Sequence, residues 1–179
     1  MPNSLLPSTW NNCDGVMFVG DSFNMRHPLT GGGMTVALND VVLLKSLLSL
    51  KNVPSFKDYG IMQSAKRRFY WQRKMHSSVI NILAQSLYAI FSASSESLQS
   101  MREACFKYFE IGGACQSGPM SLLAGLAQSP MLLLKHYIGV AFYGTYLTIA
   151  KYKLNIFRPI HVLYTAVRTI FPFILLEIK

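Results

Sequence analysis

Acidic residues are scarce in this chain. Asp and Glu together number 8 against 17 Lys and Arg, which gives a net charge of +9, and only 14% of the 179 residues are charged. A typical soluble domain carries about 25% charged residues. With 51% hydrophobic residues, the composition excludes a disordered tail and argues against a freely soluble domain. A basic and apolar chain suits either nucleic acid or an anionic membrane surface, and the apolar share favours membrane lipid, so no nucleic-acid partner is predicted.

Cysteine is also sparse. Cys13, Cys105 and Cys115 form no Cys-x-x-Cys pair and have no histidine at metal-ligand spacing, so no metal site is predicted. Pairing in a disulfide would leave one cysteine over. We expect three free thiols in a reducing compartment, such as the cytosolic side of a membrane.

Two amino-terminal features are missing as well. The first residues, MPNSLLPSTW, have neither the basic start nor the long apolar run of a secretory signal. The chain also lacks the Gly-x-Gly-x-x-Gly turn that joins the first strand and helix of a dinucleotide-binding fold. The sequence therefore predicts no complete dinucleotide fold of its own.

The chain is organised around one stretch, FVGDSFNMRHPLTGGGMTVALND, which covers residues 18–40. An apolar run at Val16–Val19 has the length of one buried strand. Three glycines open a helix whose apolar positions repeat every three or four residues and which we expect to end near residues 49–50; these positions are Ala37, Val41, Leu44 and Leu48.

Glycines at the start of a helix let a ligand approach the bare backbone. The first N–H groups of a helix have no partner within it, and the helix dipole adds partial positive charge, so this end favours a phosphate or a developing oxyanion. Asp21 can only accept hydrogen bonds when ionised, which suits the hydroxyls of a ribose or ribityl chain. A glycine-rich turn by itself fits an ordinary loop equally well.

The complete string is more specific. The segment GDSFNMRHPLTGGGMTVALNDVVLLKSLL resembles the second flavin-binding motif of the FAD-dependent, aromatic-hydroxylase-like monooxygenases, and within them the squalene monooxygenase (squalene epoxidase) family. Further segments, RRFYWQRK, SSVINILAQSLYAIF and REACFKYFEIGGACQSGP, are similar to the carboxy-terminal half of that family. The resemblance implies a mainly α chain, the carboxy-terminal fragment of an α/β FAD-binding fold. The family's amino-terminal dinucleotide fold, and the tyrosine expected near the flavin, have no counterpart in the sequence.

The resemblance also implies a set of site residues. FAD would be contacted by Gly20, Asp21, Pro28, Gly31, Gly32, Gly33 and Met34, with Leu29 beside Pro28 at the border between flavin and substrate. The hydrocarbon substrate would be lined by Phe91, Phe106, Phe109, Pro119, Leu122 and His136. His27 has two interpretations, a satisfied loop histidine or a polar group near the reacting centre. The catalytic residue remains unknown, because the expected tyrosine is missing.

Three regions are expected: residues 1–58 complete the FAD-binding domain, residues 59–130 form helices around the substrate, and residues 131–179 form a membrane-associated helical hairpin. Helices are predicted from about Tyr59, over 97–111 up to Gly112-Gly113, and over a short segment within 116–130. A basic cluster lies on the first of these, and it is interpreted as a solvated face or, alternatively, as a contact with acidic headgroups; it comprises Lys66, Arg67, Arg68, Arg73 and Lys74.

Residues 131–150 and 160–178 are each about long enough to cross a bilayer, near 20 residues. Both contain charge, and Pro172 would kink the second. A hairpin lying in one leaflet is therefore favoured over two full spans, with a basic connector at Lys151, Lys153 and Arg158.

By resemblance, the function is FAD-dependent epoxidation of squalene to (S)-2,3-oxidosqualene in sterol biosynthesis, using O2 and electrons from NADPH-cytochrome P450 reductase. The expected place is the cytosolic face of the endoplasmic reticulum membrane. The alternative is a catalytically inactive membrane-associated fragment that lacks the dinucleotide-binding half.

Overall fold

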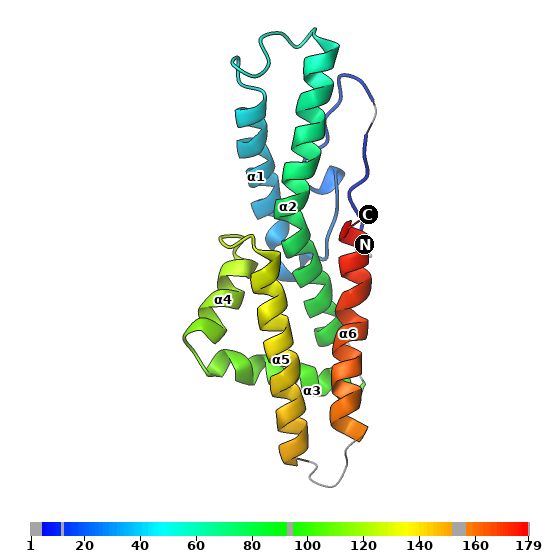
Figure 1. The fold of residues 1–179 in the computed structure, drawn as a ribbon, viewed down its shortest axis with the longest axis vertical. Helices are drawn as coiled ribbons and strands as arrows, with labels where there is room; N and C mark the ends of the chain where they lie inside the picture. Colours follow the sequence, from blue (N-terminus) through cyan, green and yellow to red (C-terminus); the bar gives the residue numbers. More distant parts are fainter. Residues whose placement is uncertain (1–4, 12, 93–94, 152–156, 179) are drawn as a thin grey trace.

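The structure, a computed structural model, describes residues 5–11, 13–92, 95–151 and 157–178. Its described part is a set of helices, most of which run along one long axis (Figure 1). In chain order these are two short 3-10 turns, η1 (Gly20–Ser22) and η2 (Pro28–Thr30), followed by α1 (Gly32–Leu47), α2 (Tyr59–Ser92), α3 (Glu96–Glu110), α4 (Ala114–Leu123), α5 (Pro130–Lys151) and α6 (Phe157–Ile178). The prediction of a mainly α chain is confirmed.

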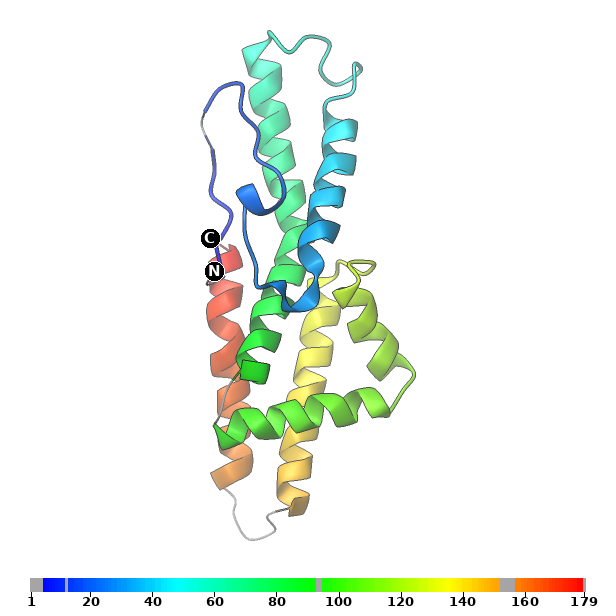
Figure 2. The same cartoon turned by 180° about the vertical axis from the view of Figure 1, so that it is seen from behind.

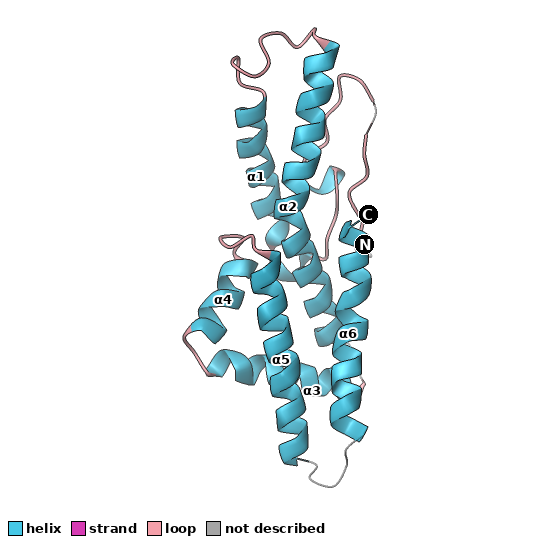
Figure 3. Cartoon of the chain, viewed as in Figure 1, coloured by secondary structure: helices cyan, strands magenta, loops and turns pink. Residues whose placement is uncertain are grey.

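The prediction of a strand at Val16–Val19 is wrong. Figure 3 shows no strand among the described residues, and the only pairing of that kind is an isolated bridge between Leu6 and Met25. Val19 does have an extended backbone, with φ −139° and ψ 158°. However, no described segment pairs with it to form a ladder, and Phe18 remains 41% exposed instead of buried. An extended run becomes a strand only when a neighbour accepts and donates its backbone hydrogen bonds.

Helices α1 and α2 form an antiparallel pair at one end of the molecule (Figure 1). The first ends at Leu47, close to the expected break, and the loop after it buries Val53. The start of α2 is capped by Asp58, whose Oδ1 accepts the Ile61 N–H at 3.1 Å. Ser55, in the loop before the helix, accepts the Lys57 N–H.

Helices α5 and α6 pack side by side and antiparallel, and α3 crosses both, as seen from behind in Figure 2. The lower half of α2 packs against α6, so these helices share their core. Its largest clusters are centred on Val79, Ile82, Leu122, Leu133 and Ile170, and on Ile90, Met101, Ala141, Val162 and Ala166. At the end of α6, Glu177 is buried and its Oε1 accepts Asn81 Nδ2–H at 2.9 Å. The expected boundary between the regions 59–130 and 131–179 stays a prediction. The helices on its two sides, α4 and α5, pack against each other.

The buried face of α1 differs from the one that the apolar repeat predicted. Val36, Asp40 and Leu47 are buried, whereas Val41 is 58% exposed. The exposed side of the helix carries an apolar stripe that no described residue covers; it consists of Met34, Leu38, Val41 and Val42. The sequence pattern identified an apolar face, but the structure packs the neighbouring face, which contains a carboxylate, against α2.

Among the described residues, one helix, over Phe157–Glu177, is long and apolar enough to cross a membrane, and 22% of its most apolar 18-residue stretch is buried. Helices α5 and α6 both also expose apolar side chains along their outer faces. On α5 these are Met131, Leu134, Ile138, Phe142, Tyr146 and Ile149, and on α6 they are Phe157, Ile160, Tyr164, Val167, Phe171 and Leu175. Of the expected basic connector, Lys153 lies outside the described residues.

Candidate functional site

The glycine-rich turn has the backbone conformation that requires glycine. Gly20 begins η1 with φ +58°, and Gly31 ends η2 with φ +64°, both in the left-handed region. Between Gly31 and α1 the chain turns sharply, so that the helix begins directly at Gly32. No side chain caps this helix start, which leaves its first N–H groups available.

Asp21 stands over the start of α1. A Cβ placed on Gly33 would lie 3.5 Å from Asp21 Oδ1, so the carboxylate and the glycine backbone share one small space. The Asp21 side chain is 64% exposed, and its Oδ1 lies 3.9 Å from Nη2 of the buried Arg26. An exposed carboxylate suits the hydroxyls of a ligand, and the uncapped helix start beside it suits an anionic oxygen.

The other residues expected around the flavin surround this point. Gly32 is buried, and a Cβ there would lie only 2.5 Å from Ile80 Cγ2, so the turn presses directly against α2. Pro28 and Gly31 are exposed, and Met34 is 72% exposed, the first member of the uncovered stripe on α1. The structure therefore brings Asp21 and the glycines together and leaves their outer side open.

A buried ion pair between Asp40 and Arg73 holds the turn at Gly20 in place. Arg73 on α2 is 1% exposed and donates from Nε to Asp40 Oδ2 at 2.9 Å, from Nη1 to Asn24 Oδ1 at 2.6 Å and from Nη2 to the Gly20 carbonyl at 3.1 Å. Asp40 Oδ2 also accepts the Gly20 N–H at 2.7 Å. The guanidinium lies 4.5 Å from the centre of the Phe23 ring, within the range of a cation–π contact.

Arg26 forms a second buried link. Its Nη2 donates to the carbonyl and Oδ1 of Asn24 at 2.9 and 3.0 Å, and its Nη1 donates to the Gly32 carbonyl at 3.4 Å. Burial lowers the pKa of Arg26, while the neighbouring Asp21 carboxylate opposes that shift. Arg26 thus ties the segment after η1 to the start of α1, and Arg73 ties η1 to Asp40 in the middle of α1.

The basic cluster on α2 is therefore not a solvated face as a whole. Arg67 and Arg68 are exposed, but Lys66, Arg73 and Lys74 are buried. Lys66 Nζ donates to the Cys13 carbonyl at 2.6 Å, and Lys74 lies over the rings of Tyr70 and Trp71 at 5.5 and 5.6 Å from their centres. Charges that find partners inside the fold can be buried, which a charge run read from sequence does not reveal.

His27 has a structural partner on each side. Its Nδ1 accepts the Leu29 N–H at 3.2 Å and so caps η2. Its ring stacks on Tyr88 of α2, with 3.8 Å between ring centres. These contacts favour the interpretation as a satisfied loop histidine.

The residues expected around the substrate do not lie together. One group contains the three phenylalanines, a second is centred on His136, and Leu122 lies in the core. Phe91 and Phe106 meet edge to face, with 5.6 Å between ring centres, where α2 and α3 come together, and Phe109 packs against the core of α3 and α5. Leu122 is 1% exposed and belongs to the central cluster.

His136 forms the second group. Its Nδ1 lies 3.0 Å from the Tyr108 hydroxyl, and its ring packs so closely on Gly118 that a Cβ there would overlap Nε2. The buried Pro119 follows Gly118 inside α4. Burial, with a smaller contribution from Lys135, lowers the pKa of His136. Burial also raises the pKa of Tyr108 to about 12, with Cys115 contributing.

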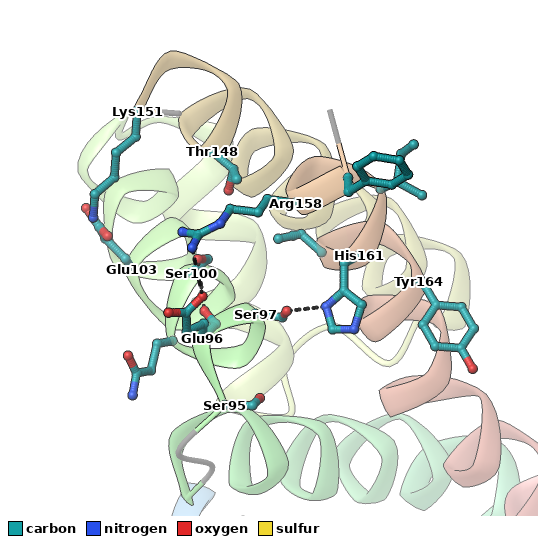
Figure 4. A pocket seen from close by; sticks show the side chains of 14 residues that line it. Ser95, Glu96, Ser97, Ser100, Glu103, Thr148, Lys151, Arg158, His161 and Tyr164 are labelled. Carbon is teal, nitrogen blue, oxygen red and sulfur yellow. Dashed lines mark hydrogen bonds and ion pairs between the residues drawn. The ribbon is translucent and has the colours of Figure 1, made fainter. Parts of the chain in front are cut away.

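A hollow of about 750 Å³ lies elsewhere, between the start of α3 and the ends of α5 and α6 that face each other (Figure 4). Ser97 Oγ is 2.5 Å from His161 Nδ1, but the nearby Glu96 pairs with Arg158 at 3.5 Å. A hydrolytic triad needs a carboxylate that orients the histidine, and here the carboxylate is directed to an arginine. This hollow contains none of the residues predicted for flavin or substrate.

Sequence reasoning missed the buried network of Asp40, Arg73, Asn24 and Arg26, and it placed Arg73 only in the basic cluster. One signal was present: Asp40 follows Val36 by four residues and precedes Leu47 by seven, which places an acid on a helix face with apolar residues. Among the described residues, no group of three or more His, Cys, Asp or Glu side chains is placed to hold a metal ion.

Comparison with known proteins identifies the family. A family model described as squalene epoxidase matches residues 1–161. The chain is 45% identical over 185 residues to the squalene monooxygenase of Rattus norvegicus, covering 100% of the chain and 32% of the relative. It is 43% identical to the squalene epoxidase of Aspergillus fumigatus and 40% identical to that of Saccharomyces cerevisiae, in each case over 99% of the chain and 37% and 36% of the relative. The chain thus spans about a third of the length of these relatives, as expected for the carboxy-terminal part that the motifs predicted. It belongs to the squalene epoxidase family.

Proposed function

We propose that this chain completes the flavin site and walls the hydrocarbon pocket of an FAD-dependent squalene monooxygenase. The whole enzyme would convert squalene to (S)-2,3-oxidosqualene for sterol biosynthesis, with O2 and with electrons from NADPH-cytochrome P450 reductase. The observation that carries the proposal is the exposed Asp21 carboxylate over Gly33 at the uncapped start of α1, in a chain of this family. FAD, when bound, would supply the oxygen activation.

The residues of this chain would bind and orient the cofactor. Asp21 would accept hydrogen bonds from flavin side-chain hydroxyls, because an ionised carboxylate only accepts. The backbone N–H groups at Gly32 and Gly33 would face a phosphate or the flavin oxygen, with the helix dipole adding positive potential. Met34 and Pro28, both exposed beside the turn, would border the ring and exclude water from it.

A squalene pocket needs apolar surface, because a hydrocarbon offers no hydrogen bonds and binds by burial, at about 25 cal/mol per Å². Phe91, Phe106 and Phe109 would supply that surface from α2 and α3. Leu122 and Pro119 are buried, so from α4 they would support the pocket wall from behind. His136 would remain neutral near pH 7, since burial lowers its pKa, and its bond to Tyr108 keeps its polar edge satisfied.

The outer face of α5 and α6 supports membrane association. Beside its apolar stripes it exposes the basic Lys135 and Arg168, while the acidic side chain of this helix pair, Glu177, is buried. Apolar side chains with flanking positive charge fit the interface of an anionic leaflet. We therefore place the pair in the cytosolic leaflet of the endoplasmic reticulum membrane, lying along it.

A chimera tests the cofactor assignment. Residues 1–179 replace the aligned third of the rat squalene monooxygenase, and FAD affinity and squalene epoxidation are measured on the purified protein. The chimera should bind FAD, and Asp21→Ala should weaken binding about 10- to 150-fold, the equivalent of a charge-assisted hydrogen bond of about 1.5–3 kcal/mol. Asp14→Ala is the matched control, because it removes an exposed carboxylate that bonds Gln63 instead. Undiminished FAD affinity in Asp21→Ala would refute the assignment.

The alternative, an inactive membrane-associated fragment, is tested on residues 1–179 alone. The open outer side of the glycine turn and the uncovered stripe on α1 predict that the isolated chain associates with detergent but retains no FAD after gel filtration. Stoichiometric flavin on the isolated chain would show that the site needs no further residues. A chimera that binds FAD but makes no oxidosqualene would favour the alternative.

A further inference from the structure

Gly20 is held on both sides by one buried ion pair. Its N–H donates to Asp40 Oδ2 at 2.7 Å, and its carbonyl accepts from Arg73 Nη2 at 3.1 Å. The same Asp40 oxygen accepts Arg73 Nε at 2.9 Å. Carboxylate, guanidinium and one backbone unit therefore close a ring of hydrogen bonds in which the two side chains come from α1 and α2.

This ring determines the position of the next residue, Asp21. The Asp21 side chain itself is 64% exposed, and its nearest charged partner is Arg26 at 3.9 Å. Its placement over Gly33 therefore depends on the backbone of Gly20, whose φ of +58° is fixed by the two bonds to the ion pair. Asp40 and Arg73 are only 1% exposed, so they do not reach the open side of the turn.

From these contacts we infer that Asp40 and Arg73 are positioning residues for the flavin site. They hold the Gly20–Asp21 turn in the shape that binds FAD, and they do so without touching the cofactor. The inference rests on the proposed function, because it assumes that Asp21 and the glycines bind FAD.

Stability alone does not account for such a pair. Taking two charges out of water costs several kcal/mol per ion, and well-packed apolar side chains of similar volume often stabilise a fold as well or better. An arginine with three acceptors in three different places, Asp40, Asn24 and Gly20, instead fixes geometry. Lysine carries the same charge on a single nitrogen, so it cannot reproduce the planar set of donors with which Arg73 reaches all three acceptors.

The test uses the chimera described above, with the variants Asp40→Asn and Arg73→Lys. Both keep a polar group of similar size in place, so that the fold is retained, and circular dichroism and thermal unfolding of the apo protein verify this. Lys107→Gln is the matched control, since it breaks the exposed Glu103–Lys107 pair of 2.9 Å on α3. The Kd for FAD is measured by flavin fluorescence, and the KM for squalene is measured at saturating FAD.

We expect each variant to raise the FAD Kd at least tenfold, while the squalene KM stays within twofold and Lys107→Gln changes neither. A purely structural pair would lower the unfolding temperature and the fraction of folded protein but leave the Kd of the folded fraction unchanged. An FAD Kd within twofold of the unsubstituted chimera, in whichever variant folds, therefore overturns the inference and leaves the proposed function standing. If the unsubstituted chimera binds no FAD, the proposed function itself fails, and the inference with it.

Discussion

Replacing Gly32 by alanine measures how closely the glycine turn approaches α2. The added Cβ would lie 2.5 Å from Ile80 Cγ2, well inside the normal carbon–carbon separation of about 3.5–4 Å. Inserting a methyl into such a contact costs about 1–3 kcal/mol. Alanine gains up to about 1 kcal/mol over glycine from helix propensity. The net expectation is a loss of about 1–2 kcal/mol in the free energy of unfolding.

Gly33→Ala is the matched control, because its Cβ would meet only the Asp21 carboxylate, at 3.5 Å or more, which is an ordinary contact. Thermal unfolding in mild detergent, followed by circular dichroism, should show Gly32→Ala lowered by about 2–8 °C, at about 2–4 °C per kcal/mol for a chain of this size. Gly33→Ala should be equal to or more stable than the parent. In the chimera, however, Gly33→Ala should weaken FAD binding, since its methyl enters the space proposed for the cofactor.

Ile80→Leu tests whether the predicted loss comes from this contact, because it removes the Cγ2 methyl group while conserving the volume of the side chain. Alone it should cost less than about 1.5 kcal/mol, and combined with Gly32→Ala it should recover part of the loss. Equal stability of Gly32→Ala and the parent, or strictly additive effects in the double variant, would refute the close approach of turn and helix.

Three further predictions concern other parts of the chain. Gly118→Ala should break the contact between α4 and His136 and lower the unfolding temperature, since its Cβ would overlap the imidazole. Burial raises the pKa of Cys105 to about 11, so maleimide should label the exposed Cys13 in the native protein, and Cys105 should stay unlabelled as the pH rises from 7 to 9, until unfolding. Phe171→Ser should reduce pelleting with anionic vesicles without lowering the unfolding temperature, because this side chain is 55% exposed.

Each of these experiments has a control variant in the same chain. Gly60→Ala meets only an ordinary contact and should leave stability unchanged or higher, unlike Gly118→Ala. The double variant Cys13→Ser/Cys115→Ser also removes the partly exposed third thiol and should abolish the fast labelling, and rapid native labelling that survives in it would contradict the burial of Cys105. Ile170→Ser removes a core side chain that is 6% exposed, so it should lower the unfolding temperature. If it were as mild as Phe171→Ser, the assignment of inner and outer faces of α6 would be wrong.

Local pattern was sufficient for most of the helices. The helix predicted over 97–111 is found at Glu96–Glu110, and the pattern beginning near Tyr59 continues to Ser92 as one helix. Apolar periodicity, glycine breaks and capping residues are properties of neighbouring residues, so the sequence displays them directly. The turns at Gly20 and Gly31 could likewise be predicted, because both positions have the left-handed backbone that favours glycine. The assignment of this segment to a flavin site came from its resemblance to the family motif and stays a prediction.

Contacts between residues far apart in the sequence could not be predicted from local pattern. Asp40 and Arg73 are 33 residues apart, and Lys66 bonds a carbonyl 53 residues away. Nothing local distinguishes a lysine or arginine that finds a buried acceptor from one that remains in water. For the same reason the run at Val16–Val19 was mistaken for a strand, since only a partner segment decides whether an extended backbone joins a sheet.

The length of α2 has a consequence for how this family can vary. One helix touches the glycine turn at three places: Arg73 meets Gly20, Ile80 meets Gly32, and Tyr88 meets His27. These positions are seven and eight residues apart, about two helical turns each, so they lie on one side of the helix, spread over about 80°. The spacing of these three contacts therefore depends on the number of residues in the helix as well as on the side chains that make them. One residue inserted between Arg73 and Tyr88 would rotate everything beyond it by about 100° and advance it by about 1.5 Å, which would detach the far end of the turn from its support.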